Sequence, residues 1–331
     1  MVETKSPKPK MTPKAVKFTL KATLTRFTEN QTTDVAASLT YFTVQTVFPA
    51  LLALVSILQL IGQSEAVMPS VIALIEESVQ DTQAAQMIVS IVTGFLDSPG
   101  AGIALVTGIL VALWSASSYV AAFSRALNRV YRVAEGRNVI RLKLRLFAVT
   151  IVMVLTMVVV LILMSLSGDF AAQVGAWTGI GARTGTLVGI AKWPLLLFML
   201  TLMVGVLYHF CPNICRNRIR WLSAGSVTAV VVALIAVAGY GFYLSNFSNY
   251  NKTYGTLAGV IIALLLFWVT NIALLLGATL DAELERTRQL LLGLPAERQL
   301  ITTPRDTTGL RAQKEQADRL ANLAHEIRLG N

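Results

Sequence analysis

Basic residues are absent from a long part of this sequence. No Lys or Arg occurs between Phe27 and Ser124, although seven basic residues precede this stretch and seven more follow within 21 positions. Two long apolar runs lie inside it, at residues 42–62 and 101–122. Lys and Arg are retained on the cytoplasmic side when apolar helices insert into a membrane. The gap therefore indicates a membrane protein whose first connection between spans faces outward.

Histidine and cysteine are also scarce, with two of each in 331 residues. His209, Cys211 and Cys215 are three candidate zinc ligands, but no fourth ligand lies nearby in the sequence. An interfacial histidine and two small apolar thiols are the simpler interpretation. We expect no bound metal and no cofactor.

Charged residues make up only 14% of the chain, whereas 54% of it is hydrophobic, which is outside the usual range for soluble domains. Apolar runs of about 20 residues cross the hydrocarbon core as helices. The chain has six such runs, at residues 42–62, 101–122, 146–167, 187–210, 222–244 and 257–280. None shows the period of two that is typical of β-barrel strands. We predict an all-α polytopic protein with six transmembrane helices in residues 42–282.

The basic residues also predict the orientation. With six spans, 25 of the 28 basic residues lie on one side, and only Arg183, Lys192 and Lys252 lie on the other. Both termini are therefore expected in the cytoplasm. The alternative, that the basic arms bind nucleic acid, is not needed because insertion alone accounts for them. We expect no nucleic acid partner, a basic arm at residues 1–41 and a partly disordered polar tail at residues 283–331.

A basic amphipathic helix is predicted ahead of the first span. Val16, Leu20 and Leu24 recur at helical spacing between residues 14 and 27, with lysines elsewhere on the wheel. Such a helix lies on an anionic leaflet, either as a topology anchor or for specific lipid recognition. In the outward connection, residues 63–100, we expect two short amphipathic helices. They lie on the membrane surface or form a cap over the spans.

Arginines follow the second span on one helix face. Arg125, Arg129 and Arg132 recur at i, i+4 and i+7, and Asn128 lies beside them. A similar set, which begins at Arg137, precedes the third span. These residues form either a solvated face that contacts headgroups or a site for a phosphate-bearing lipid or ligand. Anionic headgroups of the cytoplasmic leaflet are the expected partners in both cases.

Polar residues inside the spans are further candidates for lipid or substrate contact. Gln45 and Pro49 give the first span a polar, kinked character, so it lines a cavity or packs against neighbours that satisfy it. Asn271, near the middle of the last span, is a structural clasp or a substrate contact. Asp281 and Glu285 end this span one turn apart, and we expect them to pair with the arginines of the second connection.

Several short sequence blocks occur in a characteristic order: Ala36-Ala-Ser-Leu-Thr-Tyr-Phe-Thr, Leu113-Trp-Ser-Ala-Ser, Arg125-Ala-Leu-Asn-Arg-Val-Tyr, Glu135-Gly-Arg, Leu207-Tyr-His-Phe-Cys-Pro-Asn and Leu276-Gly-Ala-Thr-Leu-Asp-Ala-Glu-Leu. Together they resemble the YihY/BrkB family of bacterial inner-membrane proteins over residues 25–288. Three residues depart from the family pattern. Gln45 replaces an apolar residue, His209 a basic one, and Thr279 a common Glu, so this chain lacks the family's acid at that position.

The resemblance implies a six-span helical bundle in the bacterial inner membrane. The family has carried a ribonuclease label, but metal-dependent hydrolysis needs a cluster of His and acidic residues, which this sequence lacks. We therefore expect no enzymatic activity. The favoured hypothesis is a protein that handles or moves lipid or another amphipathic molecule in envelope homeostasis. The alternative is a non-transporting scaffold of envelope assembly, and small-residue helix faces also suit self-association into a homo-oligomer.

Overall fold

The computed structural model describes residues 10–60, 101–165, 183–215, 222–246 and 257–330, with four isolated residues between 61 and 100. The described chain forms helices and no strand beyond an isolated bridge between Ile214 and Pro304. The helices are α1 (Pro13–Glu29), α2 (Thr32–Leu60), α5 (Ala101–Val130), α6 (Val139–Ser165), α8 (Arg183–Phe210), α9 (Ala224–Asn246), α11 (Leu257–Leu291) and α12 (Thr308–Leu329). The predicted all-α class is confirmed for this part of the chain.

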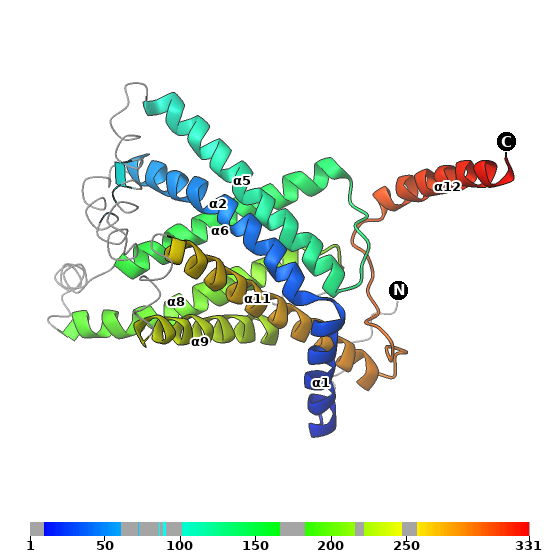
Figure 1. The fold of residues 1–331 in the computed structure, drawn as a ribbon. Coiled ribbons are helices and arrows are strands. Elements are labelled where there is room, and N and C mark those ends of the chain that lie inside the picture. Colours follow the sequence, from blue (N-terminus) through cyan, green and yellow to red (C-terminus); the bar gives the residue numbers. More distant parts are fainter. Residues whose placement is uncertain are drawn as a thin grey trace.

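The long helices pack as a closed ring. Each contacts the next along the chain, in the order α2, α5, α6, α8, α9 and α11, and α11 packs back against α2 (Figure 1). Contacts of α5 with α8 and with α11 cross the ring and fill its centre. Helices that follow each other in the sequence are thus neighbours in space.

Among the residues that the structure describes, four helices contain apolar stretches that are long enough to cross a membrane: Val139–Val160, Ile190–Phe210, Ala224–Tyr243 and Val260–Leu291. The first two expected spans lie within α2 and α5. Several helices are longer than the apolar runs that predicted them, because hydropathy detects only the part that suits hydrocarbon. For example, α5 continues to Val130 and α11 to Leu291, past the predicted boundary at residue 282.

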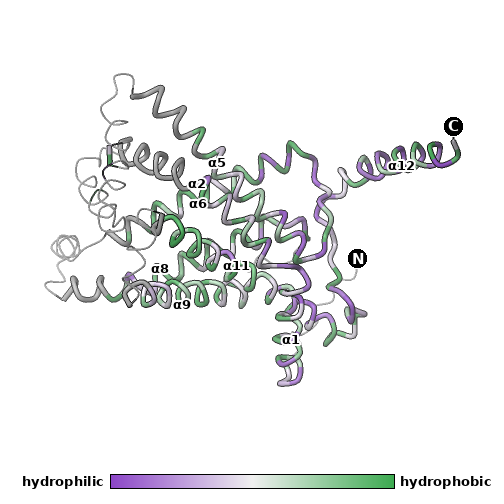
Figure 2. The backbone as a smooth tube through the Cα atoms, viewed as in Figure 1, coloured by the Kyte–Doolittle hydropathy of each residue, from purple (hydrophilic) through white to green (hydrophobic). Residues whose placement is uncertain are grey.

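Hydrophilic residues gather at one end of the bundle, where α1, the end of α5 and the end of α11 meet (Figure 2). We call this the polar end. Helix α1 runs across the direction of the long helices here, and α12 begins at the same end (Figure 1). The predicted outward connection at residues 63–100 lies outside the described residues, apart from the four isolated ones.

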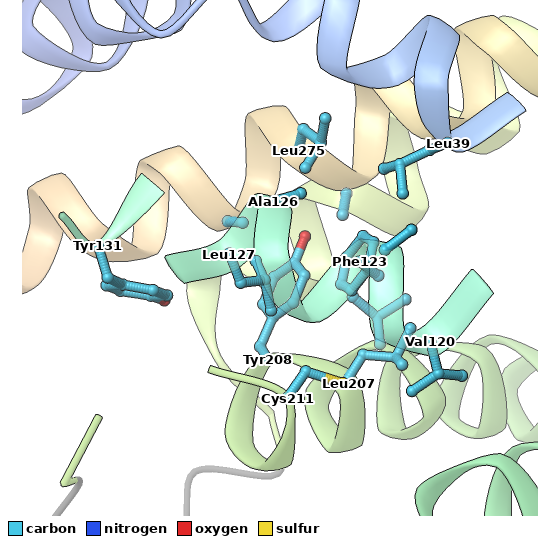
Figure 3. Packing of buried hydrophobic residues seen from close by; sticks show 14 of the residues in the cluster. Leu39, Val120, Phe123, Ala126, Leu127, Tyr131, Leu207, Tyr208, Cys211 and Leu275 are labelled. Atoms are coloured by element: carbon cyan, nitrogen blue, oxygen red, sulfur yellow. The ribbon is translucent and has the colours of Figure 1, made fainter. Parts of the chain in front are cut away.

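The best-buried part of the core lies next to the polar end. Phe123 stacks between Tyr119 and Tyr208, with ring centroids 6.0 and 6.3 Å away. Figure 3 shows Tyr208 reaching from α8 between α5 and α11, next to Leu127 and Leu275. The Tyr208 hydroxyl donates a hydrogen bond to the Leu274 carbonyl. These aromatic side chains fill the centre of the helix bundle near the polar end at close-packed density.

Candidate functional site

The structure separates the sequence-predicted contact residues into two groups. Gln45 on α2 and the arginines of α5, Arg125 and Arg129, are exposed, whereas Asn128, Asn271 and Asp281 are buried. The remaining two candidates are Arg132 and Pro49. Arg132 is exposed at the turn after α5, and Pro49 lies within α2, where its side chain is outside the described residues. One face does not hold all the predicted residues.

The exposed residues lie where α2 and α5 pack together. The Arg125 guanidinium lies over the Phe42 ring, 5.8 Å from its centroid, and Tyr41 meets the same ring edge-on at 5.4 Å. Tyr41 is 65% exposed, and Gln45 follows it by one turn on the same helix face. We call Tyr41, Phe42, Gln45, Arg125 and Arg129 the α2/α5 outer face. It offers two cations beside aromatic and amide groups, a combination that suits a phosphate headgroup.

Arg132 has a different role from the two arginines before it. It adopts a left-handed backbone conformation, with φ 51°, at the turn that ends α5. Its guanidinium is 3.3 Å from the Glu29 carboxylate, which also pairs with Arg26 at 2.6 Å. These ion pairs connect the end of α5 to α1. Because they are largely exposed, each contributes little to stability, about 0–1 kcal/mol.

Asn128 belongs to a buried network rather than to the arginine face. Its amide donates to the Glu135 carboxylate at 2.8 Å, and its oxygen accepts the Asn213 backbone N–H at 2.8 Å. Arg137, which the sequence grouped with a headgroup-contacting set, has a side chain only 2% exposed. It donates to Glu135, to the Ser124 hydroxyl and to the Cys211 carbonyl. We call Ser124, Asn128, Glu135, Arg137 and Asn213 the loop network.

The loop network also fixes the chain after α11. The Asn213 amide donates to the Asp306 carbonyl at 2.9 Å, and the Asp306 N–H donates back to Asn213 at 3.2 Å. The Cys215 N–H donates to the Thr303 carbonyl at 2.8 Å. Residues 303–306 of the predicted tail are therefore packed against two loops of the bundle. The polar character of this segment does not show that it forms hydrogen bonds with residues that are distant in the sequence.

Both polar atoms of the Asn271 side chain form hydrogen bonds that join three helices. It is 2% exposed on α11, and its oxygen accepts the Tyr119 hydroxyl of α5 at 2.9 Å. Its amide donates to Thr40 and Thr43 of α2, both at 3.3 Å. No polar atom of this side chain is left to hold a substrate, so the geometry favours the structural clasp of the two interpretations.

Asp281 caps a helix rather than pairing with an arginine of the second connection. Its Oδ1 accepts the Gly225 backbone N–H at 2.8 Å, at the start of α9. A negative charge is favourable at a helix N-terminus, where backbone N–H groups are unpaired. Gly225 and Gly277 let α9 and α11 approach closely, since a Cβ on Gly225 would collide with the Gly277 carbonyl. Glu285 pairs with Arg288 of its own helix at 3.3 Å.

Within the described part of the chain, no three His, Cys, Asp or Glu side chains come together as a metal site would require. Cys211 is fully buried, and burial raises the pKa of its thiol to about 12. Cys215 is exposed two residues after Asn213.

Sequence reasoning missed the pairing of Glu135 with Arg137 and the role of Tyr119. Glu135-Gly-Arg137 was visible as one of the blocks that carry the family resemblance, but nothing in the spacing shows that Arg137 turns inward. Tyr119 carried no signal, because an aromatic residue in an apolar run is ordinary.

Comparisons with known proteins agree on a family. The family model described as "Virulence factor BrkB" matches residues 23–300. The chain is 28% identical over 271 residues to "Putative ribonuclease-like protein YfkH" of Bacillus subtilis, covering 82% of this chain and 96% of that protein. It is 29% and 26% identical to proteins named "UPF0761 membrane protein" from Ralstonia nicotianae and Laribacter hongkongensis, covering 36% and 59% of those longer chains. No solved structure matches.

Proposed function

Since this chain belongs to the Virulence factor BrkB family and is an integral membrane protein, we propose that it handles or moves lipid in the bacterial inner membrane. In this proposal six helices span the membrane, both termini are cytoplasmic, and the polar end lies at the cytoplasmic leaflet. The position of α1 and of the start of α12 at one end of the bundle supports an arrangement with both termini on one side.

The observation that carries the proposal is the α2/α5 outer face. Arg125, Arg129 and Gln45 are exposed on the outside of the bundle, on the two helices that contain the first two predicted spans. In a bilayer these groups meet lipid, where an unpaired amide costs several kcal/mol. A phosphate headgroup near the interface satisfies the arginines, and its neighbouring ester groups satisfy Gln45. An anionic phospholipid at this face explains all three exposed polar groups.

The packed centre of the bundle argues for an outer path. Tyr119, Phe123 and Tyr208 fill the centre near the polar end, and Asn271 is satisfied by protein partners. A lipid that passed through the ring would have to separate these contacts. A lipid on the outer face instead moves its headgroup along exposed polar side chains while its acyl chains stay in hydrocarbon.

We further propose that the chain does no chemical catalysis. One relative is named ribonuclease-like, at 28% identity, and the other two described above are named as membrane proteins. Three acids at the polar end, Glu135, Asp281 and Glu283, are engaged in ion pairs or capping. Hydrolysis requires an open site with an activated water, so these engaged carboxylates favour the lipid proposal over a nuclease.

Retention of lipid tests the proposal. Native mass spectrometry of protein purified from mixed phosphatidylglycerol and phosphatidylcholine should show phosphatidylglycerol retained by the wild type. The double variant Arg125→Gln with Arg129→Gln should lose this preference. A matched control, Arg311→Gln with Arg319→Gln, removes two exposed charges from α12 and should keep it. Equal retention by the wild type and the outer-face variant, with both correctly folded, would contradict the proposal.

A scaffold role is the second candidate, and one observation favours it. Helix α12 leaves the bundle and buries none of its residues (Figure 1). A docking helix of this kind suits a protein that assembles with others. A lipid assay that gives no transport with folded protein would favour this candidate.

A further inference from the structure

Helix α12 is a two-sided helix whose apolar side is uncovered. Its 22 residues include no buried residue, and Leu320, Leu323 and Ile327 are 61%, 54% and 78% exposed. Charged residues occupy the opposite side: Arg311, Lys314, Glu315, Asp318, Arg319 and Glu326. In proteins most of the stability of a helix comes from packing of its apolar side against another surface.

The apolar side follows a coiled-coil repeat. Leu310, Gln313, Ala317, Leu320, Ala324 and Ile327 are separated by three, four, three, four and three residues. This alternation places one seam along a helix that pairs with another helix. The seam contains small and aliphatic residues, with Gln313 as its single polar member. The helix has no proline, and its glycines lie only at its first turn and at its C-terminal cap.

The base of α12 is fixed to the bundle. The Gly309 N–H donates to the Gly136 carbonyl at 2.6 Å, and the Gln313 side chain donates to the Glu135 carbonyl at 3.2 Å. Gly136 has no room for a side chain, because a Cβ there would collide with the Asp306 carbonyl. The helix therefore extends from the polar end in a fixed direction, away from the apolar helices (Figure 1).

We propose that the α12 helices of two copies of this chain pair as a parallel coiled coil. Two copies inserted with the same orientation are related by an axis along the membrane normal, which brings identical helices together in parallel and in register. Because Gln313 is bonded to the bundle, the part of the seam that can pair runs from Ala317 to Ile327, about 15 Å at 1.5 Å per residue. Such a short seam is weak alone, but confinement in one membrane raises the effective concentration of the partner.

The charges of α12 favour a second copy over the lipid surface. Four basic residues against three acidic ones leave a net charge of +1 (Arg311, Lys314, Arg319 and Arg328; Glu315, Asp318 and Glu326). A helix held on an anionic membrane instead carries a strong basic excess. The direction of α12, away from the bundle, also keeps it off the membrane plane. This inference does not depend on the lipid proposal.

Disulfide cross-linking tests the pairing in the full chain. With Cys215→Ser as background, Ala317→Cys and Ala324→Cys place a thiol on the seam, and Asn322→Cys places one on the opposite side. In proteoliposomes at low protein density, mild oxidation should give covalent dimers from both seam variants and several-fold fewer from Asn322→Cys. Adding Leu320→Asp to Ala317→Cys should abolish its dimer. These exposed positions leave the fold intact.

Two results would overturn the proposal. The first is equal cross-linking from the seam and the opposite side, which indicates random collision. The second is no seam dimer together with a blue shift of bimane attached to Ala324→Cys that grows with the anionic lipid content, which assigns the apolar side to the membrane.

Discussion

At the scale of single residues, Asn271 holds three helices together through one side chain. Replacing it by Leu removes its bonds to Tyr119, Thr40 and Thr43 and leaves their hydroxyls without this partner. Interhelical hydrogen bonds in membranes average about 0.6 kcal/mol, so we expect Asn271→Leu to destabilise the protein by about 1–2 kcal/mol. Unfolding in mixed micelles measures this difference. Thr156→Val, which removes a bond within one helix, should be nearly neutral.

Arg137 is the residue whose loss should cost the most stability. Its buried guanidinium neutralises Glu135 and binds the Ser124 hydroxyl and the Cys211 carbonyl. Removing one partner of a buried ion pair typically costs about 3–5 kcal/mol, and the partial exposure of Glu135 places Arg137→Met near the lower figure. Arg141→Gln, on the exposed face of α6, serves as the matched control and should change stability little. Equal effects of the two substitutions would contradict the buried network.

Glu135 makes the same network sensitive to acid. Burial raises the pKa of its carboxyl, but the hydrogen bonds and charge of Arg137 and a bond from Asn128 outweigh it, so the pKa lies below its ordinary value. A lowered pKa stabilises the folded chain above the unfolded pKa of about 4.3, and this stabilisation is lost as the pH falls through the folded pKa. We expect thermal stability to fall more steeply below pH 4.3 in the wild type than in Glu135→Gln.

At the scale of elements, α1 presents three different sides. Ala15, Thr19 and Thr23 are buried, and the Thr19 hydroxyl bonds Thr287 of α11 at 2.8 Å. The predicted apolar stripe of Val16, Leu20 and Leu24 is 44–64% exposed, so the described part of the protein does not cover it. Beyond the buried side, Phe18, Lys21 and Arg286 line a groove of about 340 Å³. The stripe is therefore free to enter the membrane, as the amphipathic pattern predicts.

Quenching by brominated lipids measures which side of α1 faces the bilayer. A tryptophan introduced as Leu24→Trp lies on the stripe, and one introduced as Thr25→Trp lies on the groove side. Against the five native tryptophans as a constant background, we expect the added fluorescence to be quenched strongly at position 24 and weakly at position 25. The reverse order would place the groove, rather than the stripe, against lipid.

The segment before α12 makes buried contacts with the bundle, whereas α12 has no buried residue and is bonded to the bundle only at its base. Arg286 is 6% exposed and donates to the carbonyls of Ala296 and Glu297, and Asn213 binds Asp306. A chain that ends at residue 307 keeps these bonds and should unfold near the wild-type temperature. A chain that ends at residue 294 loses them and should unfold at a clearly lower temperature, because buried donors are left unpaired. Thermal unfolding in detergent distinguishes the two truncations.

At the scale of the whole molecule, apolar runs were sufficient to predict a helical membrane protein. They could not predict the loop network, because Asn128, Asn213 and Asp306 are far apart in sequence and come together only through the ring of helices. Helical periodicity placed Asn128 beside Arg129, yet one is buried and the other exposed. Past the apolar run, the helix face that becomes buried is decided by the segments that pack against it. A single sequence does not show which segments these are.

A dithionite assay with fluorescent phospholipid in proteoliposomes tests the central claim most directly. The account predicts that wild-type protein lets quenching proceed beyond the outer-leaflet half of the signal. Arg125→Gln with Arg129→Gln should return quenching to that half, while Arg311→Gln with Arg319→Gln should not. Quenching that stops at the outer-leaflet half for folded wild-type protein would contradict lipid movement along the α2/α5 outer face.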